Sequence, residues 1–401
     1  MTDYLPTRRP TRVAAGLLAL ALGTFALGTS EFVVMGMVSV LSASLEVSVS
    51  ATGAVVTAYA VGVAVGAPLM ILALNRVQRQ RALLILLGIF VVSHVAAACA
   101  PTFEWLVVLR FVGGLPHGAF FGLAAVVATS LVPPSAQGRA IAVVIAGLTV
   151  ANVVGVPAAT ALAQHAGWRA SFGVVAALGA LALVTVATSV PADLEVPLPS
   201  IRDEFGGLFN RHSLLTIATV AVGFSGLFAV YAYIDPLMTQ HFGLDEAHLP
   251  WVLAVVGIGF TVGTLIGGWA TDRSVRWALI CGLLVFAIAL AVLPLVGSVA
   301  AAVALLFVIG GASFAAEPPI QKRLIDQAPD APTVASATNQ SAFNVANAIG
   351  AAVGGVIIAS GSSPVVLGPI GAAFVVVGLV LAILSLASDR NSRDRNGLAA
   401  R

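Results

Sequence analysis

The stretch at positions 82–99, ALLILLGIFVVSHVAAAC, contains no Asp, Glu, Lys or Arg. A helix needs about 20 mainly apolar residues to cross a hydrocarbon core of roughly 30 Å. The strands of a membrane barrel are about 10 residues long and alternate apolar with polar residues, and this stretch does neither. It therefore predicts a transmembrane helix.

Similar stretches recur along the whole chain. Hydrophobic residues make up 59% of the 401 residues and charged residues only 9%, against about 45–50% and about 25% in soluble proteins. Twelve spans are predicted, at 13–40, 51–74, 82–99, 104–131, 138–163, 168–189, 214–239, 249–271, 276–296, 299–321, 333–359 and 364–386. Positions 1–190 are expected to form one six-helix bundle, 191–213 a cytoplasmic linker, and 214–401 a second bundle with a short tail.

Basic residues are distributed unevenly between the predicted spans. With the amino terminus in the cytoplasm, Arg169 falls outside and Arg110 lies within a span, which leaves 17 of the 19 Lys and Arg residues on the cytoplasmic side. Membrane proteins keep their positive loops on that side. We therefore expect a multi-pass protein of the bacterial inner membrane with both termini in the cytoplasm.

The two predicted bundles share a sequence pattern. Gly66 precedes Arg76 by ten residues, and Gly263 precedes Arg273 by the same number, at an offset of 197. The pair Gly113-Gly114 recurs as Gly310-Gly311 at the same offset. Because the matches keep the order of the helices, they indicate a duplicated bundle of the kind found in transporters.

Several motifs resemble those of the major facilitator superfamily. The segments at 268–276 (GWATDRSVR), 110–118 and 147–157 resemble its loop signature, its fourth-helix arginine motif and its fifth-helix antiporter motif. Those at 27–36, 115–122 and 167–172 resemble the drug:proton antiporter branch, which includes arabinose-efflux and chloramphenicol-resistance exporters. The resemblance implies an all-α membrane protein in which two six-helix repeats surround a central cavity. It also implies a proton-coupled antiporter that exports small molecules by alternating access.

The same resemblance implies a set of gating residues. They are Asn75, Arg76, Arg79, Gly155, Pro157, Asp272, Arg273 and Arg276. The first loop departs from the signature, since Ile71 and Asn75 stand where Gly and Asp are usual. An anionic gate contact is therefore not expected there in the usual form.

Ionisable residues within the spans are the first candidates for proton coupling, because charge is costly in a membrane and usually lines a functional path. Helical spacing puts Glu31 on one face of the first span and Arg110 and His117 on one face of the fourth. Glu31 is predicted to carry the proton or to meet cationic substrate, and the alternative is a static ion pair with Arg110. His117 is either a proton relay or part of a packing motif, whereas His94 is expected to be a satisfied core or near-surface histidine.

Two acids of the second bundle complete the proton-coupling candidates. Asp235 precedes Pro236 near a helix end, where a solvated role is the alternative. Glu317 precedes a Pro pair that predicts a gating bend, and the alternative for Glu317 is an ion pair with Lys322 or Arg323.

Substrate-binding candidates combine aromatic area with amide groups that need partners in an apolar medium. They are Thr24, Met35, Phe121, Asn152, Phe224, Phe228, Tyr231, Phe314, Gln340, Asn344 and Asn347. For the amides, the alternative is contact between helices alone.

Motifs for chemistry are missing from the sequence. It contains no Gly-Lys-Ser/Thr phosphate loop and no metal-ligand cluster, so neither an enzyme nor a cofactor is expected. The expected partners are a small-molecule substrate, protons and the lipid bilayer, with no nucleic acid, and the chain is expected to be a monomer. A proton-coupled uptake permease and a nontransporting receptor or scaffold on the same fold remain alternatives.

Overall fold

The computed structural model describes residues 10–74, 76–192, 211–328 and 332–399. Within them, twelve helical segments are long and apolar enough to cross a membrane, from Thr11–Gly36 to Pro364–Ser388. Each corresponds to one of the predicted spans. Most of the predicted linker lies outside the described residues, so the domain boundaries stay a prediction.

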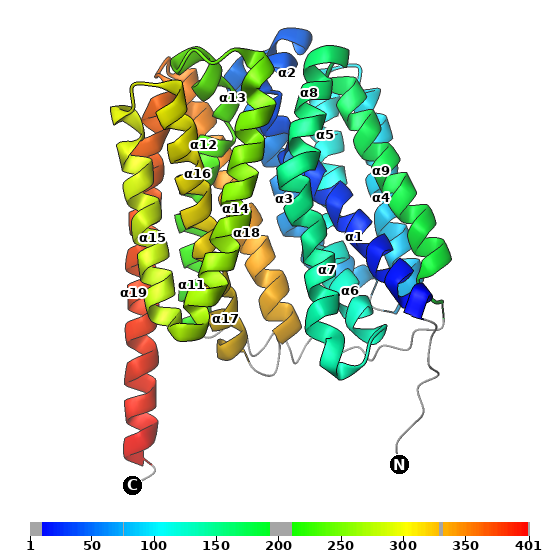
Figure 1. Ribbon diagram of the computed structural model, residues 1–401, viewed down its shortest axis with the longest axis vertical. Coiled ribbons are helices and arrows are strands. Elements are labelled where there is room, and N and C mark those ends of the chain that lie inside the picture. Colours follow the sequence, from blue (N-terminus) through cyan, green and yellow to red (C-terminus); the bar gives the residue numbers. More distant parts are fainter. Residues whose placement is uncertain (1–9, 75, 193–210, 329–331, 400–401) are drawn as a thin grey trace.

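Figure 1 shows the helices side by side as two groups. The first contains α1 (Pro10–Val33), α2 (Val38–Leu45), α3 (Val49–Ala73), α4 (Arg79–Ala98), α5 (Phe103–Gly114), α6 (His117–Ser130), α7 (Gln137–Val150), the π-helix η3 (Ala151–Gly155), α8 (Val156–Ala166) and α9 (Trp168–Ser189). The second contains α11 (Arg211–Gly223), α12 (Ser225–Tyr231), α13 (Ile234–Pro236), the π-helix η4 (Leu237–His241), α14 (Leu249–Arg273), α15 (Val275–Val292), α16 (Val299–Ala315), α17 (Glu317–Gln327), α18 (Pro332–Ala359) and α19 (Leu367–Ala399). We call these groups the first and second halves.

The two ends of the bundle differ. The start of α1 and the end of α19 lie at one end, which we call the proximal end (Figure 1). Helices α2 and α13 lie at the opposite, distal end. An even number of spans puts the start of the first span and the end of the last on the same side, and the cytoplasmic orientation of that side stays a prediction.

Proline explains two of the helix breaks. The fourth span divides into α5 and α6 around Leu115 and Pro116, because proline has no N–H to donate and its ring clashes with the preceding turn. The tenth span divides between Ala315 and Glu317, immediately before Pro318-Pro319. The predicted bend is therefore present.

The repeat in the sequence is also a repeat in packing. At four glycines, an added Cβ would meet a backbone carbonyl of a neighbouring helix. The pairs are Gly62 with Phe111, Gly66 with Leu115, Gly259 with Phe307, and Gly263 with Gly311. The first two glycines bring α3 against α5, and the second two bring α14 against α16 in the same way. Small residues allow this close approach of helix backbones in membranes.

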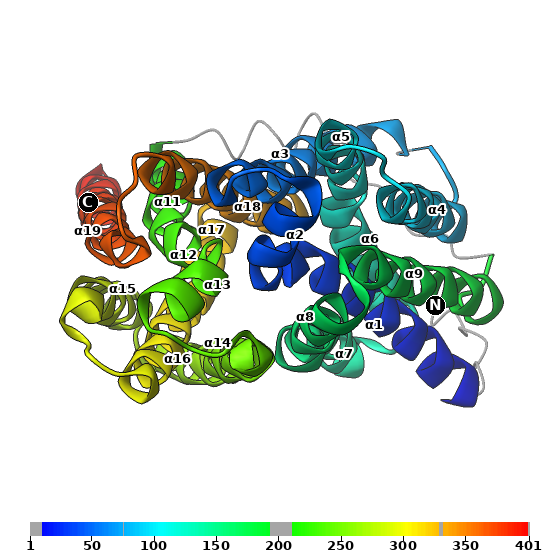
Figure 2. The same cartoon turned by 90° about the horizontal axis from the view of Figure 1, so that it is seen from above.

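The two halves are packed against each other. Viewed from above in Figure 2, α3 lies beside α18, and α14 lies beside α8 and η3. An added Cβ at Gly257 of α14 would meet the backbone of Asn152 in η3. One apolar cluster contains buried residues of both halves, among them Phe32 and Phe228. Ionisable and amide groups near this interface can therefore be reached from both halves.

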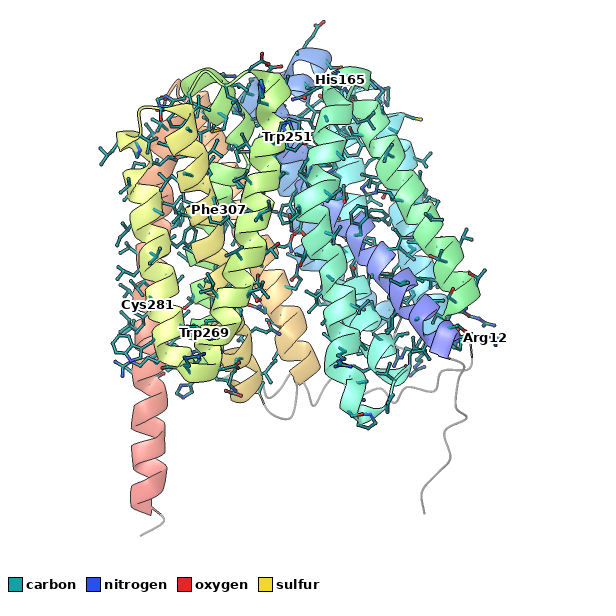
Figure 3. The ribbon with its side chains drawn as sticks, viewed as in Figure 1. Arg12, His165, Trp251, Trp269, Cys281 and Phe307 are labelled. Carbon is teal, nitrogen blue, oxygen red and sulfur yellow. The ribbon has the colours of Figure 1, made fainter. Side chains whose placement is uncertain are left out.

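The outer surface of the bundle is apolar and carries aromatic residues near its ends. Leu18 and Leu265 are 65% and 69% exposed, as expected for side chains that face lipid. Figure 3 places Trp251 toward the distal end and Trp269 toward the proximal end. Tryptophan is enriched at both membrane interfaces, so the two positions are consistent with the edges of the bilayer.

Candidate functional site

Glu31 and His117 meet inside the first half. Both side chains are buried, with exposed fractions of 1% and 0%, and Oε2 of Glu31 lies 3.6 Å from Nε2 of His117. This separation exceeds a hydrogen bond of roughly 2.7–3.2 Å, so the two groups are close neighbours without a hydrogen bond between them. The acid and the histidine that helical spacing put on facing stripes are thus neighbours.

Arg110 approaches this pair without bonding to it. Its Nη1 donates a hydrogen bond to Oγ of Ser30 at 2.9 Å, and its guanidinium lies 3.9 Å from the ring centroid of Tyr59. Among the described residues, the only basic side chain within 4.0 Å of the Glu31 carboxyl is His117. The predicted alternative, a direct Glu31–Arg110 ion pair, is therefore not formed.

Directed hydrogen bonds continue from Arg110 to His94. Nε2 of His94 lies 2.6 Å from Oγ of Ser30, and Nδ1 lies 2.8 Å from the carbonyl oxygen of Phe90. A carbonyl only accepts, so Nδ1 carries the proton and Nε2 accepts from Ser30 when the ring is neutral. His94 is the satisfied core histidine that was predicted, and it orients Ser30 toward Arg110.

Tyr59 is a member of this cluster that sequence reasoning missed. Its hydroxyl lies 2.9 Å from Nδ1 of His117, so a tyrosine of α3 contacts the ring that faces Glu31. Ser30 was missed as well. The signal was available in both cases, since Ser30 adjoins Glu31 and Tyr59 is a tyrosine within the second predicted span.

The second half reaches the same carboxyl. The side chain of Asn344 on α18 lies near Glu31. Phe32, the next residue of α1, lies 6.4 Å from Phe228 and 5.9 Å from Tyr231 between ring centroids. The Glu31 region is therefore bounded by both halves.

Beyond Phe228 and Tyr231, further aromatic rings of the second half contact one another in succession. Successive ring centroids are 5.0 Å apart for Phe228–Phe343, 5.9 Å for Phe343–Phe314, 4.3 Å for Phe314–Phe260 and 5.5 Å for Phe260–Tyr231. Phe224 joins at 5.5 Å from Phe343. We call these six residues the aromatic wall. Four of them were predicted; Phe260 and Phe343 were missed because their faces depend on how α14 and α18 pack.

Several buried polar atoms of Glu31 and of the predicted substrate residues lack a hydrogen-bond partner among the described residues. They are Oε1 of Glu31, Oδ1 of Asn152, the hydroxyl of Tyr231, Oδ1 of Asn344 and both polar side-chain atoms of Asn347. A buried polar group without a partner costs roughly 1–3 kcal/mol, and such groups are usually satisfied by water or a ligand. These atoms suit a site that exchanges water for substrate.

Other predicted substrate residues make protein contacts. The hydroxyl of Thr24 donates to the carbonyl of Val144 at 2.6 Å, which joins α1 to α7. Phe121 stacks on His117 with centroids 4.9 Å apart. Met35 is buried in the core that both halves share, and the backbone carbonyl of the half-buried Gln340 accepts from the Asn344 amide at 3.2 Å.

Glu317 and Asp235, the two candidate acids of the second half, each have hydrogen-bond partners other than the Glu31 cluster. Oε1 of Glu317 accepts from the amide of Asn339 at 2.8 Å. Lys322, one of the two partners considered for Glu317, instead pairs with Asp326 at 3.0 Å. Asp235 is 2% exposed, which corrects the solvated alternative, and it bonds to the first half at the distal end.

The gating residues implied by the motifs are scattered. Asn75 lies outside the described residues. Arg79 is buried where α4 begins, and Gly155 and Pro157 surround the junction of η3 with α8, whereas Arg76 and Asp272 are exposed. Arg273 and Arg276 lie over the rings of Trp269 and Trp277, at 3.5 Å and 5.5 Å.

A twelve-helix bundle in two repeated halves, with an acid and an aromatic wall between them, defines a multi-pass membrane transporter. The family model of the Major Facilitator Superfamily matches residues 20–236 and 215–400. The chain belongs to this superfamily.

Relatives and a solved structure agree with this assignment. The chain is 39% identical to the inner membrane transport protein YdhP of Escherichia coli (strain K12), over 92% of this chain and 94% of the relative. It is 32% identical to the chloramphenicol resistance protein of Streptomyces lividans, over 92% and 94%. The crystal structure of the nucleoside transporter NupG superposes with a TM-score of 0.72 at 16% identity, covering 94% of this chain and 99% of that one. That last likeness shows the fold alone.

Proposed function

We propose that this protein is a proton-coupled antiporter that exports small molecules from the cytoplasm by alternating access. The observation that carries the proposal is the position of Glu31. Its buried carboxyl lies 3.6 Å from His117 of the first half, and Asn344 of the second half lies nearby. Any rearrangement of the halves must therefore change the surroundings of a group that can bind a proton.

Coupling follows from this geometry. Burial favours the neutral form of a carboxyl, while nearby cations and hydrogen-bond donors favour the charged form. When the halves part, water reaches Glu31 and Asn344 moves away from it, so the affinity for a proton changes with conformation. A group of this kind can load a proton on one side of the membrane and release it on the other.

The contacts of His117 support a relay to Glu31. The Tyr59 hydroxyl can donate to Nδ1 of the neutral ring, and this leaves the proton on Nε2, the nitrogen that faces Glu31. A fixed partner on one ring nitrogen determines which tautomer the other presents. In this proposal Tyr59 positions the histidine, and Arg110 supplies the positive charge nearby.

The aromatic wall and the amides indicate the substrate class. Stacked rings provide a broad apolar surface, and the unpartnered atoms of Tyr231, Asn152 and Asn347 can offer hydrogen bonds to a substrate. Such a site suits a partly apolar molecule with a few hydroxyl or amide groups. The printed name of the Streptomyces lividans relative, a chloramphenicol resistance protein, agrees with a substrate of this kind.

Orientation completes the proposal. The basic residues predict that the proximal end faces the cytoplasm and the distal end the outside. The name of the Escherichia coli relative, an inner membrane transport protein, supports the bacterial inner membrane as the location.

Inverted membrane vesicles with an imposed pH gradient test this function. Amphenicols, sugars, nucleosides and lipophilic cations are added in turn, while a pH-sensitive dye reports the vesicle interior. An antiporter releases protons from the vesicles when its substrate enters. Proton flow in the same direction as substrate would indicate an uptake permease, and no response to any compound would favour a nontransporting protein.

A further inference from the structure

At the distal end, a carboxylate of the second half caps a helix of the first half. Helix α2 follows Met37, which makes no side-chain capping bond. Instead, Oδ2 of Asp235 accepts from the backbone N–H of Ser39 at 2.6 Å, and Oδ1 accepts from the Ser39 hydroxyl at 2.9 Å. The first N–H groups of a helix lack partners within it and favour negative charge, so this cap comes from the opposite half.

We propose that the contact between Asp235 and Ser39 is a latch, which holds the distal end closed and must release whenever the protein opens to that side. Figure 2 shows α2 and α13 next to each other at this end. The two halves cannot separate here without breaking both hydrogen bonds. The latch goes beyond the proposed function because it requires alternating access alone, whichever ion or substrate drives the cycle.

Few ionisable groups surround the latch. Among the elements packed against α13, neither α2 nor the 3-10 helix η1 (Val34–Gly36) contains an ionisable residue. η4 contributes His241, whose Nδ1 lies 3.0 Å from the Ser363 hydroxyl. Glu246, in the 3-10 helix η5 (Glu246–His248), acts on Asp235 as a like charge.

The latch is expected to respond to pH in a defined direction. Asp235 lies beyond Tyr231, where the seventh candidate span ends. Burial raises the pKa of Asp235 to about 6, against the lowering effect of its bonds to Ser39, and Glu246 adds to the rise. In the open state water reaches the carboxyl, and its pKa returns toward an ordinary value of about 4.

The sign follows from the order of these two pKa values. The closed state binds the proton more tightly than the open state, so acidification favours closure. The extra stability that this proton gives the closed state is fully present below about pH 4 and is lost as the pH rises through about 6. A difference of about two pKa units bounds the change in the closed-to-open ratio at about 100-fold.

Spin-label distances across the distal end test the latch. In a background with Cys99→Ser and Cys281→Ser, labels are attached at His165→Cys in the first half and Gly297→Cys in the second, both exposed positions. A side chain at Gly297 meets no other atom within 4 Å, and Figure 3 shows His165 at the distal end. Distances are recorded in nanodiscs without substrate or gradient, from pH 4 to pH 8.

Two substitutions of Asp235 are expected to act in opposite directions. Asp235→Asn imitates the protonated carboxyl, so it should raise the closed-to-open ratio at neutral pH and remove the part of the pH step that Asp235 causes. Asp235→Ala removes the cap and should lengthen the distance at every pH. Ser39→Ala removes one of the two bonds and should lower the closed-to-open ratio while keeping the pH step.

Asp245→Asn provides a matched control. The Asp245 carboxylate accepts from Ala247 within its own loop at 2.9 Å, so this change should leave the distances as in the unsubstituted protein. The proposal is overturned if Asp235→Ala leaves the distances unchanged, or if the pH step in Asp235→Asn is as large as in the unsubstituted protein. Because the readout is a distance, failure of proton-coupled export in the vesicle assay would leave this result standing.

Discussion

Nε2 of His117 lies 3.6 Å from Oε2 of Glu31, and the two residues belong to different helices, α6 and α1. The other nitrogen of the ring is 2.9 Å from the Tyr59 hydroxyl on α3. Three helices of one half thus converge on a carboxyl that Asn344, on α18 of the other half, also approaches. A buried histidine held on one side and facing an acid on the other is suited to pass protons.

Tyr59→Phe is expected to weaken proton coupling more than it weakens folding. The change removes the group that fixes the His117 tautomer and leaves the ring beside Arg110. One lost hydrogen bond corresponds to about 0.5–1.5 kcal/mol, so transport should slow up to about tenfold and its pH profile should change shape. The measurement is the initial transport rate as a function of pH in vesicles.

Tyr233→Phe is the control for that experiment. The Tyr233 hydroxyl donates to the Ala351 carbonyl at 3.0 Å, so its loss should lower thermal stability but leave the pH profile unchanged. A profile that moves equally in both variants would show that Tyr59 acts only through packing.

Tyr231→Phe should affect substrate binding without a cost in stability. Its buried hydroxyl lacks a hydrogen-bond partner among the described residues, and removing such a group is neutral or stabilising by up to about 1 kcal/mol. If the hydroxyl meets substrate, KM should rise several-fold for a hydrogen-bonding compound. An unchanged KM for every transported compound would remove Tyr231 from the site.

Gly263→Ala tests the close approach of α14 and α16. An added Cβ would meet the carbonyl of Gly311, so the helices must part, and we expect a loss of roughly 1–3 kcal/mol by analogy with overpacked cores. At Gly268, on the same helix, the Cβ would meet nothing, and Gly268→Ala should stabilise by up to about 1 kcal/mol. Thermal unfolding in detergent compares the two; equal shifts would contradict the packing argument.

The spans and their repetition were predictable because each depends on local sequence alone. A run such as 82–99 has only one stable state in a membrane, a helix that satisfies its own backbone. The glycines at 66 and 263 marked equivalent packing in both halves because backbones can approach closely only where side chains are small.

The site was only partly predictable, because its contacts depend on how helices rotate and cross. Glu31 and His117 were found from helical spacing, whereas Phe260 and Phe343 join the aromatic wall through tertiary packing. Helical spacing puts Thr24 on the same face of the first span as Glu31, yet the Thr24 hydroxyl donates to the carbonyl of Val144. The partner of Asp235 is 196 positions away, and no local pattern connects such residues.

Glu31→Gln in proteoliposomes tests the central claim most directly. Transport driven by a pH gradient is compared with exchange of labelled for unlabelled substrate, which needs no net movement of protons. Because Gln keeps the size of the side chain but binds no proton, exchange should continue near the rate of the unsubstituted protein while gradient-driven transport is lost. Gradient-driven transport at an undiminished rate in Glu31→Gln would contradict the account.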